Sequence, residues 1–453
     1  MINTIIFNDE IKVWWEYVKL AEGEFFKIFL NGTEVGRTIK SHFNIKNLRQ
    51  ETEYEIKTEK CNALGKAVFS VGFVKAKTLK TKKRIDITES PYCAVPDGKT
   101  LNTFALERAI ADCKPDECVY IPDGVYLISA VDLKSNVELY LSEKAVIKGS
   151  ADEKDYLPKI KSRFEGTERL CYRSLFNAGT LDSKGGSNCG NIVIRGGKII
   201  GGGNELRENI INAEKQNVLK EYGLENELNP PAFYSRVLPG RTRGRLFGFN
   251  NVKNVIIANG TWGESPSWNM HFVYCENVVT CSGTILSHKI SNGDGWDPDS
   301  SENCIAFDLS FDTGDDCVAI KSGKNLEGYL ISRPCRHIRV FDIDTIDGHG
   351  IAIGSEMSGG ISDVVVWNCN IVAGTGIYLK SSEKRGGYIK DVKFYNCFAS
   401  TVNILSGYDF CNSDGEAAPV KPEISDIVFE DITVTGIGIF TGEHDRIEPE
   451  TAV

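Results

Sequence analysis

The chain has 453 residues, of which 41% are hydrophobic and 25% are charged, so it is long enough to bury a large core. Asp and Glu number 62 against 52 Lys and Arg, and the net charge of −10 opposes general binding to nucleic acid or to anionic membrane surfaces. No apolar run approaches the roughly 20 residues that a bilayer span requires, so we expect neither a nucleic-acid nor a membrane partner.

The first residues and the cysteines indicate where the chain works. Asp9 and Glu10 occur early, and no basic segment leads into an apolar stretch, so we expect no secretory signal and a cytoplasmic location. The 14 cysteines form no Cys-x-x-Cys pair, which removes the usual zinc spacing. We therefore expect mostly reduced thiols, no metal and no other cofactor.

Residues 1–85 read as a small β-sandwich. Short alternating segments are separated by turn signals, at Lys12–Tyr17, Phe25–Leu30, Tyr54–Lys57 and Ala67–Val71. The stretches 29–36 and 48–56 resemble a fibronectin type III module, with Trp15 as the core tryptophan and Tyr54 in the position of the tyrosine corner. The resemblance implies a first domain over residues 1–85.

Residues 86–453 carry a repeat of short strands. Each unit starts with Asn, Asp or His before an apolar strand, and these anchors are Asn191, Asn254, Asn277, Asn303, His337, Asp363, Asp391 and Asp426. A second polar or small residue stands five positions after each anchor. Units of this kind bury their apolar side by stacking, and Asn or Asp at one bend can form hydrogen bonds along the stack. The pattern predicts an all-β fold, a right-handed parallel β-helix.

Two stretches interrupt the repeat. Residues 102–112 have a helical period and an Asn or Thr start, which predicts a helix that caps the N-terminal end of the solenoid. Residues 204–247 form a polar, partly helical insertion with four arginines close together, Arg236, Arg241, Arg243 and Arg245.

Unusual polar residues occur at similar distances after the anchors of successive coils. They are Asp294, Asp315, Asp316, His349 and Lys380. Residues at one phase of a solenoid lie above one another at roughly the 4.8 Å strand spacing, so we expect these side chains to share one groove.

The chemistry of such a groove has more than one reading. A solvated polar face or a calcium site would also gather carboxylates, but Trp296 stands in Asn292–Asp297 where a calcium loop needs its third ligand. Asp315 and Asp316 are adjacent after Gly314, and both can reach one groove only from a turn or bulge. Hydrolysis of a glycoside with inversion needs two carboxyl groups roughly 6.5–9.5 Å apart, a separation that one or two coils provide.

At four places, in order, the sequence resembles the polygalacturonases of glycoside hydrolase family 28, over about residues 90–440. The motifs are Asn292–Asp297, Gly314–Asp316, Gly348–Gly350 and Tyr378–Lys380. The resemblance implies that Asp315 is the general acid, that Asp294 and Asp316 activate water, and that His349 supports the protonation state of the acid. It also implies a substrate-binding group, made of Asn292, Tyr378, Lys380, Arg243 and Arg245.

One position departs from the family pattern. Tyr378 stands where the family usually has Arg, which removes a bidentate contact to a sugar carboxylate; Lys384 or Arg385 could replace it. The segment Gly354–Gly360 and the N-terminal module resemble bacterial exo-acting members of the family.

The resemblance therefore implies an inverting hydrolase of α-1,4-galacturonosyl linkages in pectic oligosaccharides, acting from a chain end. Alternatives on the same fold are a hydrolase of rhamnogalacturonan or xylogalacturonan, a calcium-dependent pectate-type lyase, and a non-catalytic carbohydrate-binding solenoid. The sequence does not predict an oligomeric state.

Overall fold

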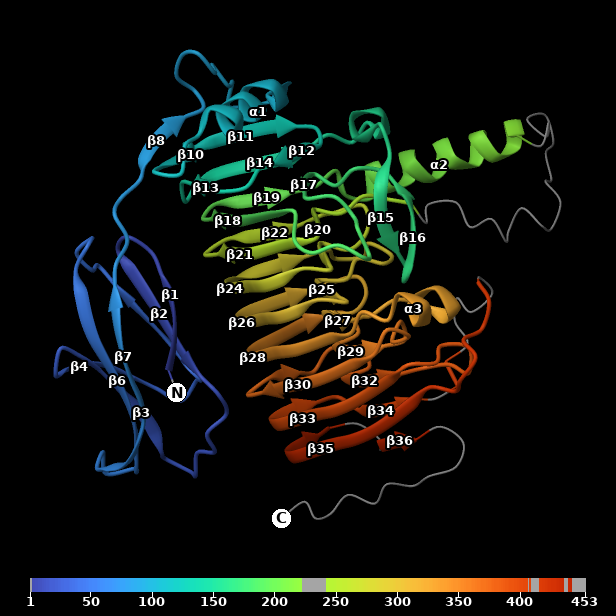
Figure 1. Cartoon of the computed structure of the whole chain (residues 1–453). Helices are drawn as coiled ribbons and strands as arrows, with labels where there is room; N and C mark the ends of the chain where they lie inside the picture. The colour runs from blue at the N-terminus through green and yellow to red at the C-terminus, as the bar shows by residue number, and fades with distance from the viewer. Residues whose placement is uncertain (1, 222–241, 406, 409–414, 436–438, 442–453) are drawn as a thin grey trace.

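The computed structural model describes residues 2–221, 242–405, 407–408, 415–435 and 439–441. Arg236 and Arg241 of the predicted insertion lie outside these residues. Most of the described chain is one tall stack of strands, and a smaller group of strands lies along its side (Figure 1). No described helix is both long and apolar enough to cross a membrane.

The N-terminal module packs two antiparallel sheets face to face. One sheet contains β1 (Ile2–Ile6), β2 (Glu10–Trp15) and β5 (His42–Lys46); the other contains β4 (Thr33–Thr38), β3 (Phe25–Leu30), β6 (Glu53–Cys61) and β7 (Ala67–Lys77). Trp15 is fully buried and meets Phe26 edge to face at 4.9 Å. The Tyr54 hydroxyl accepts a hydrogen bond from the Arg49 N–H at 2.9 Å, as the tyrosine corner requires. The predicted small sandwich is confirmed.

The stack is a parallel β-helix with two long sheets. The 17-stranded sheet contains β8 (Lys83–Asp86), β9 (Asp97–Leu101), β10 (Glu117–Ile121), β11 (Gly124–Ile128), β13 (Val137–Leu141), β14 (Ala145–Gly149), β18 (Cys189–Arg195), β19 (Lys198–Ile200), β21 (Val252–Ala258), β22 (Thr261–Gly263), β24 (Glu276–Leu286), β26 (Glu302–Asp312), β28 (Cys335–Asp347), β30 (Ile361–Trp367), β31 (Asn370–Ile371), β33 (Tyr388–Ala399) and β35 (Glu423–Val434). The ten-stranded sheet contains β12 (Val131–Leu133), β17 (Phe176–Ala178), β20 (Phe247–Asn250), β23 (Met270–Val273), β25 (Trp296–Asp299), β27 (Val318–Ile320), β29 (Ile351–Gly354), β32 (Ile377–Lys380), β34 (Val402–Leu405) and β36 (Ile439–Thr441). The predicted domain boundary at residue 85 falls within β8, which pairs with β10.

The anchors occupy the bends for which their side chains suit them. Asn254, Asn277 and Asn303 have φ of 57°, 57° and 54°, a left-handed conformation that Asn tolerates better than most residues. Asn277 Nδ2 donates to Asn254 Oδ1 at 2.9 Å, and Asn303 Nδ2 donates to Asn277 Oδ1 at 3.2 Å. This amide ladder is the hydrogen bonding along the stack that the repeat predicted.

Helices and one hairpin decorate the stack. Helix α1 (Thr103–Asp112) covers its N-terminal end with Leu106 and Ile110 buried, as predicted. Helix α2 (Gly203–Glu221) begins the insertion, and η1 (Glu153–Tyr156) and α3 (Asn325–Ile331) are short. The hairpin of β15 (Ile160–Phe164) and β16 (Thr167–Cys171) runs beside the ten-stranded sheet toward α3 (Figure 1).

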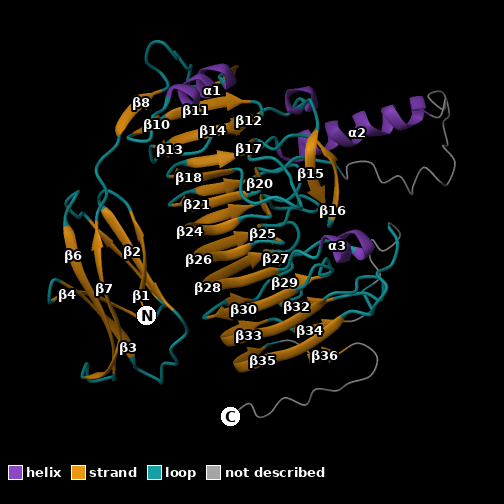
Figure 2. Ribbon diagram, viewed as in Figure 1, coloured by secondary structure: helices purple, strands orange, loops and turns teal. Residues whose placement is uncertain are grey.

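The module docks on the outside of the long sheet. Figure 2 shows its sheets beside the edge of the coils rather than beyond an end of the stack. Trp14 packs at 5.6 Å from Phe341, which stacks on Phe307 at 4.8 Å and on Trp367 at 4.3 Å. His42 lies between two carboxylates, with Nδ1 at 2.7 Å from Asp342 and Nε2 at 3.3 Å from Asp308.

Candidate active site

The predicted residues lie at the ends of four neighbouring strands of the ten-stranded sheet. Asp294 precedes β25, Asp315 and Asp316 precede β27, His349 precedes β29, and Lys380 ends β32. The loops are held in register by backbone hydrogen bonds: the N–H of Gly295 donates to Asp316 O, and that of His349 donates to Asp315 O, both at 2.9 Å. The coils that carry these side chains are therefore aligned as the repeat phase predicts.

Four of these side chains contact one another directly. His349 Nδ1 lies 3.0 Å from Asp315 Oδ1 and 3.8 Å from Asp316 Oδ1. Lys380 Nζ lies 2.8 Å from Asp316 Oδ2, and both groups are buried. The site thus combines carboxylates with an imidazole and an ammonium, the groups that acid–base chemistry on an anionic substrate requires.

The pKa values of Asp294 and Asp315 are shifted in opposite directions. Burial raises the pKa of Asp294 to about 7, against the attraction of Lys321 and with the help of Asp315 and Asp316. Burial also acts to raise the pKa of Asp315, but the hydrogen bond and charge of His349 outweigh it, so this pKa lies below its ordinary value. The two carboxyl groups therefore titrate differently, and Lys321 offsets part of the effect of burial on Asp294.

Sequence reasoning missed Lys321, which follows β27. Its Nζ lies 3.1 Å from Asp294 Oδ2 and 3.5 Å from Asp297 Oδ1, and the residue is only 4% exposed. The ammonium also lies 4.7 Å from the centre of the Trp268 ring. A lysine directly after a buried strand, six residues beyond Asp315, is the signal that could have revealed it.

Arg243 and Arg245 are buried beneath the groove. Arg243 donates to the carbonyls of Pro266 and Ser291 at 2.8 and 3.0 Å and to Asn292 Oδ1 at 2.7 Å, and burial lowers its pKa to about 10. Arg245 lies beside the stacked rings of Phe164 and Trp268, 4.6 Å from each ring centre, and donates to Arg163 O at 2.8 Å. These contacts hold the backbone in place, so substrate binding by Arg243, Arg245 and Asn292 stays a prediction.

Tyr378 and Lys380 lie together on β32. Lys380 Nζ is 5.2 Å from the Tyr378 ring centre and 5.4 Å from that of Tyr408. Arg385 is buried and donates to Ser355 O and to Asn325 Oδ1 at 2.8 and 2.6 Å. This arrangement argues against Arg385 as the replacement for the missing arginine, whereas Lys384 is exposed.

Comparison with known proteins agrees with this geometry. The sequence model of "Glycosyl hydrolases family 28" matches residues 234–439, which include every predicted site residue. An exo-poly-alpha-D-galacturonosidase of Dickeya chrysanthemi is 28% identical over 438 residues, or 91% of this chain and 71% of the relative. A probable polygalacturonase of Vitis vinifera is 32% identical, over 66% of this chain and 58% of the relative.

Two solved structures have a fold similar to that of this chain. The family 28 exopolygalacturonase of Yersinia enterocolitica superposes with a TM-score of 0.81 at 22% identity, covering 98% of this chain and 88% of that one. An exopolygalacturonase of Thermotoga maritima superposes with a TM-score of 0.64 at 28% identity, covering 78% and 81%. The chain therefore resembles glycoside hydrolase family 28 in sequence over residues 234–439, and it shares the fold of these exopolygalacturonases.

The hairpin β15–β16 supports this site from the side. Arg163 of the hairpin is fully buried, and its guanidinium bonds to Asp299 Oδ1 at 2.6 Å. Asp299 also contacts His271 Nε2 at 3.2 Å. At the hairpin tip, Gly166 O accepts a hydrogen bond from the N–H of Lys324 at 3.0 Å. The hairpin therefore bridges several coils beside the groove.

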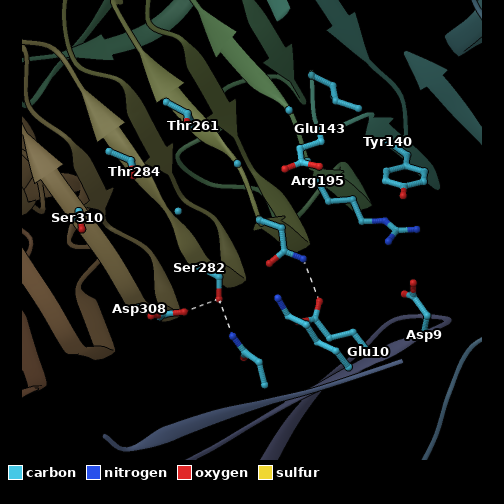
Figure 3. Close-up of a pocket in the computed structure, with 18 of the residues that line it drawn as sticks. Asp9, Glu10, Tyr140, Glu143, Arg195, Thr261, Ser282, Thr284, Asp308 and Ser310 are labelled. Atoms are coloured by element: carbon cyan, nitrogen blue, oxygen red, sulfur yellow. Dashed lines mark hydrogen bonds between the residues drawn. The ribbon is translucent and has the colours of Figure 1, made fainter. Parts of the chain in front are cut away.

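A wide cavity elsewhere does not fit the acidic substrates of the family. It measures about 900 Å³ and lies between the module and the solenoid (Figure 3). Four carboxylates line it, Asp9, Glu10, Glu143 and Asp308, against two cations, Lys46 and Arg195. The lining is thus net negative and would repel a polyanion, whereas Lys321 and Lys380 place positive charge beside Asp294 and Asp316.

Proposed function

We propose that this enzyme hydrolyses α-1,4-galacturonosyl linkages of pectic oligosaccharides with inversion, starting from a chain end. The observation that carries the proposal is the set of three carboxyl groups on two successive coils, with His349 at 3.0 Å from Asp315 and Lys380 at 2.8 Å from Asp316. Two carboxyl groups on stacked coils leave room for a water between acid and base, as inversion requires.

In this reaction one proton moves on each side of the anomeric carbon. Asp315 gives its proton to the glycosidic oxygen, and the bond from that oxygen to the anomeric carbon breaks. Water attacks the same carbon from the other face and gives a proton to Asp294 or Asp316. Lys380, at the edge of this group, supplies the positive charge that a substrate carboxylate needs.

In the free site the pKa of Asp315 is low, whereas a general acid must hold a proton; the substrate removes this difference. A galacturonate carboxylate brings negative charge next to Asp315 and displaces water, and both changes raise the pKa of a carboxyl group. Substrate binding would therefore bring the proton to Asp315, while His349, whose pKa is raised chiefly by its hydrogen bond with Asp315, stands beside it as the donor.

Action from a chain end has two supports. The Dickeya chrysanthemi relative and the Thermotoga maritima structure are both named as exo-acting enzymes. In this chain, the hairpin β15–β16 places Phe164 against Trp268, 5.1 Å between ring centres, directly below Lys321. We infer that the hairpin limits how much of a substrate chain can bind on this side of the site.

The experiment follows products from galacturonan and from short oligogalacturonides, with and without a chelator. We expect reducing ends to increase without ultraviolet absorbance, small products from the first minutes, slow loss of viscosity and no effect of the chelator. Ultraviolet-absorbing products would indicate a lyase, and rapid loss of viscosity would indicate internal cleavage. Binding without product, equal to that of Asp315→Asn, would indicate a non-catalytic solenoid.

A further inference from the structure

Beneath Asp294 lies a buried carboxyl group for which the mechanism above gives no role. Asp297 of β25 is completely buried, and neither of its oxygens accepts a hydrogen bond from any described residue. Asp294 Oδ1 likewise accepts none within the described chain. Three buried carboxylate oxygens without a donor are costly, because each has lost its hydration.

The only cation in contact with both carboxyl groups, among the described residues, is Lys321. One ammonium at 3.1 Å from Asp294 and 3.5 Å from Asp297 can balance one negative charge but not two. The pair therefore resembles two carboxyl groups that share one proton, the arrangement adopted when like charges are forced together.

We propose that Lys321 and Asp297 are positioning residues for Asp294: Lys321 holds Asp294 ionised as the base, and Asp297 keeps a proton that it donates to Asp294 in a hydrogen bond. The inference rests on the proposed function, in which Asp294 is a base. It explains why a base can remain charged in a site that excludes water. Burial followed by the charge of Asp294 raises the pKa of Asp297 well above its ordinary value, in keeping with a retained proton.

Other charges also face this cluster and must be held constant in a test. Asp294 is faced by Asp315 and Asp316 from the loop before β27, by Lys380 from β32 and by Arg245 from the segment before β20. Lys321 is faced by Glu356 from the loop after β29. None of them is altered by substitutions at Lys321 or Asp297.

The test measures the acidic limb of the pH profile of kcat/KM on an oligogalacturonide. Lys321→Met should move this limb to higher pH by about 1–3 units, because a nearby cation lowers a carboxyl pKa by that amount and its loss raises it. Lys321→Arg, which keeps the charge, should restore the limb. Lys148→Met, the same change at an exposed site on β14, should not move it.

Asp297→Asn separates a protonated from an ionised Asp297. Asparagine is neutral and can donate, so it mimics the protonated acid and should leave the limb where it is. If Asp297 is ionised in the native enzyme, the substitution removes a like charge beside Asp294 and the limb moves to lower pH, which overturns the proposal. An unmoved limb in Lys321→Met would overturn it as well.

A second measurement does not depend on activity. Infrared spectra at neutral pH should contain the carbonyl band of a buried protonated carboxyl group, and Asp297→Asn should remove it. A wild type with no activity on galacturonides would refute the proposed function, whereas the infrared band still decides where the proton resides. A band that persists in Asp297→Asn contradicts the assignment of that proton to Asp297.

Discussion

The ion pair between Lys380 and Asp316 gives the sharpest prediction about the site. Its 2.8 Å separation corresponds to a gross attraction of about 6 kcal/mol at an effective dielectric constant of about 20. Most of this attraction offsets desolvation, but removing one partner leaves the other charge buried, at a cost of about 3–5 kcal/mol. We therefore expect Lys380→Met to lower the free energy of unfolding by about 3–5 kcal/mol.

The double variant Lys380→Met with Asp316→Asn removes both charges and should be more stable than Lys380→Met alone. Urea midpoints compare the variants, since the unfolding of a solenoid need not be two-state. Lys390→Met, at an exposed position on β33, is the matched control and should change stability by less than about 0.5 kcal/mol. If the single and double variants unfold at the same midpoint, the buried pair is not a stabilising contact and the reasoning fails.

The pH range of this contribution follows from the pKa of Lys380, which Asp316 raises above its ordinary value in spite of burial. A raised lysine pKa means that the stabilisation is complete below the unfolded value of about 10.4 and is lost only as the pH rises through the folded value. The difference between wild type and Lys380→Met should therefore be constant from neutral pH to about pH 9. On galacturonides, the same variant should raise KM and lower kcat, and unchanged constants would remove Lys380 from the substrate site.

Four further predictions concern the chemistry and the module. Asp315→Asn should lower kcat by about 10²–10⁴-fold with little change in the urea midpoint, and near-normal turnover would exclude Asp315 as the acid. Proton NMR of early hydrolysis should show the β-anomer of galacturonate first; initial α-anomer would contradict inversion. Tyr378→Arg should raise kcat/KM on plain galacturonides about tenfold relative to xylose-bearing ones, through one added charge-assisted contact. Burial opposes a charged His42, but hydrogen bonds to Asp308 and Asp342 outweigh it and raise the pKa of His42. The protease resistance of the docked module should therefore be highest below about pH 6.5 and should fall as the pH rises through the raised pKa. The variant His42→Asn should abolish this pH dependence.

The features that sequence could predict are those with local causes. Asn277 and Asn303 mark their coils because a left-handed bend selects Asn, and a fixed strand spacing then brings Asp294, Asp315 and His349 together. The same logic predicted α1, since a solenoid end needs a cover. The cytoplasmic location and the roles of single site residues remain predictions.

The features that sequence could not predict join residues that are distant along the chain. Arg163 reaches Asp299 from a hairpin, 136 positions earlier, and no repeat phase links the two. The sequence marked Asp297 only as the last residue of the motif Asn292–Asp297, because its burial beside Asp294 and Lys321 depends on how neighbouring coils pack. Charged residues at strand positions that should be apolar are the signal for such clusters.

In contrast, the repeat itself indicates which face of the solenoid the module covers. In each coil, the residues one and three positions after the anchor face the core, so the residue four positions after it faces outward. At that outward position stand Phe307, Phe341 and Trp367, and all three are fully buried. A ladder of large aromatic side chains on the outside of a solenoid requires a cover, and Trp14 of the module supplies it. The module is thus part of the solenoid's own packing, and its removal should expose this ladder to solvent and make the catalytic coils aggregate.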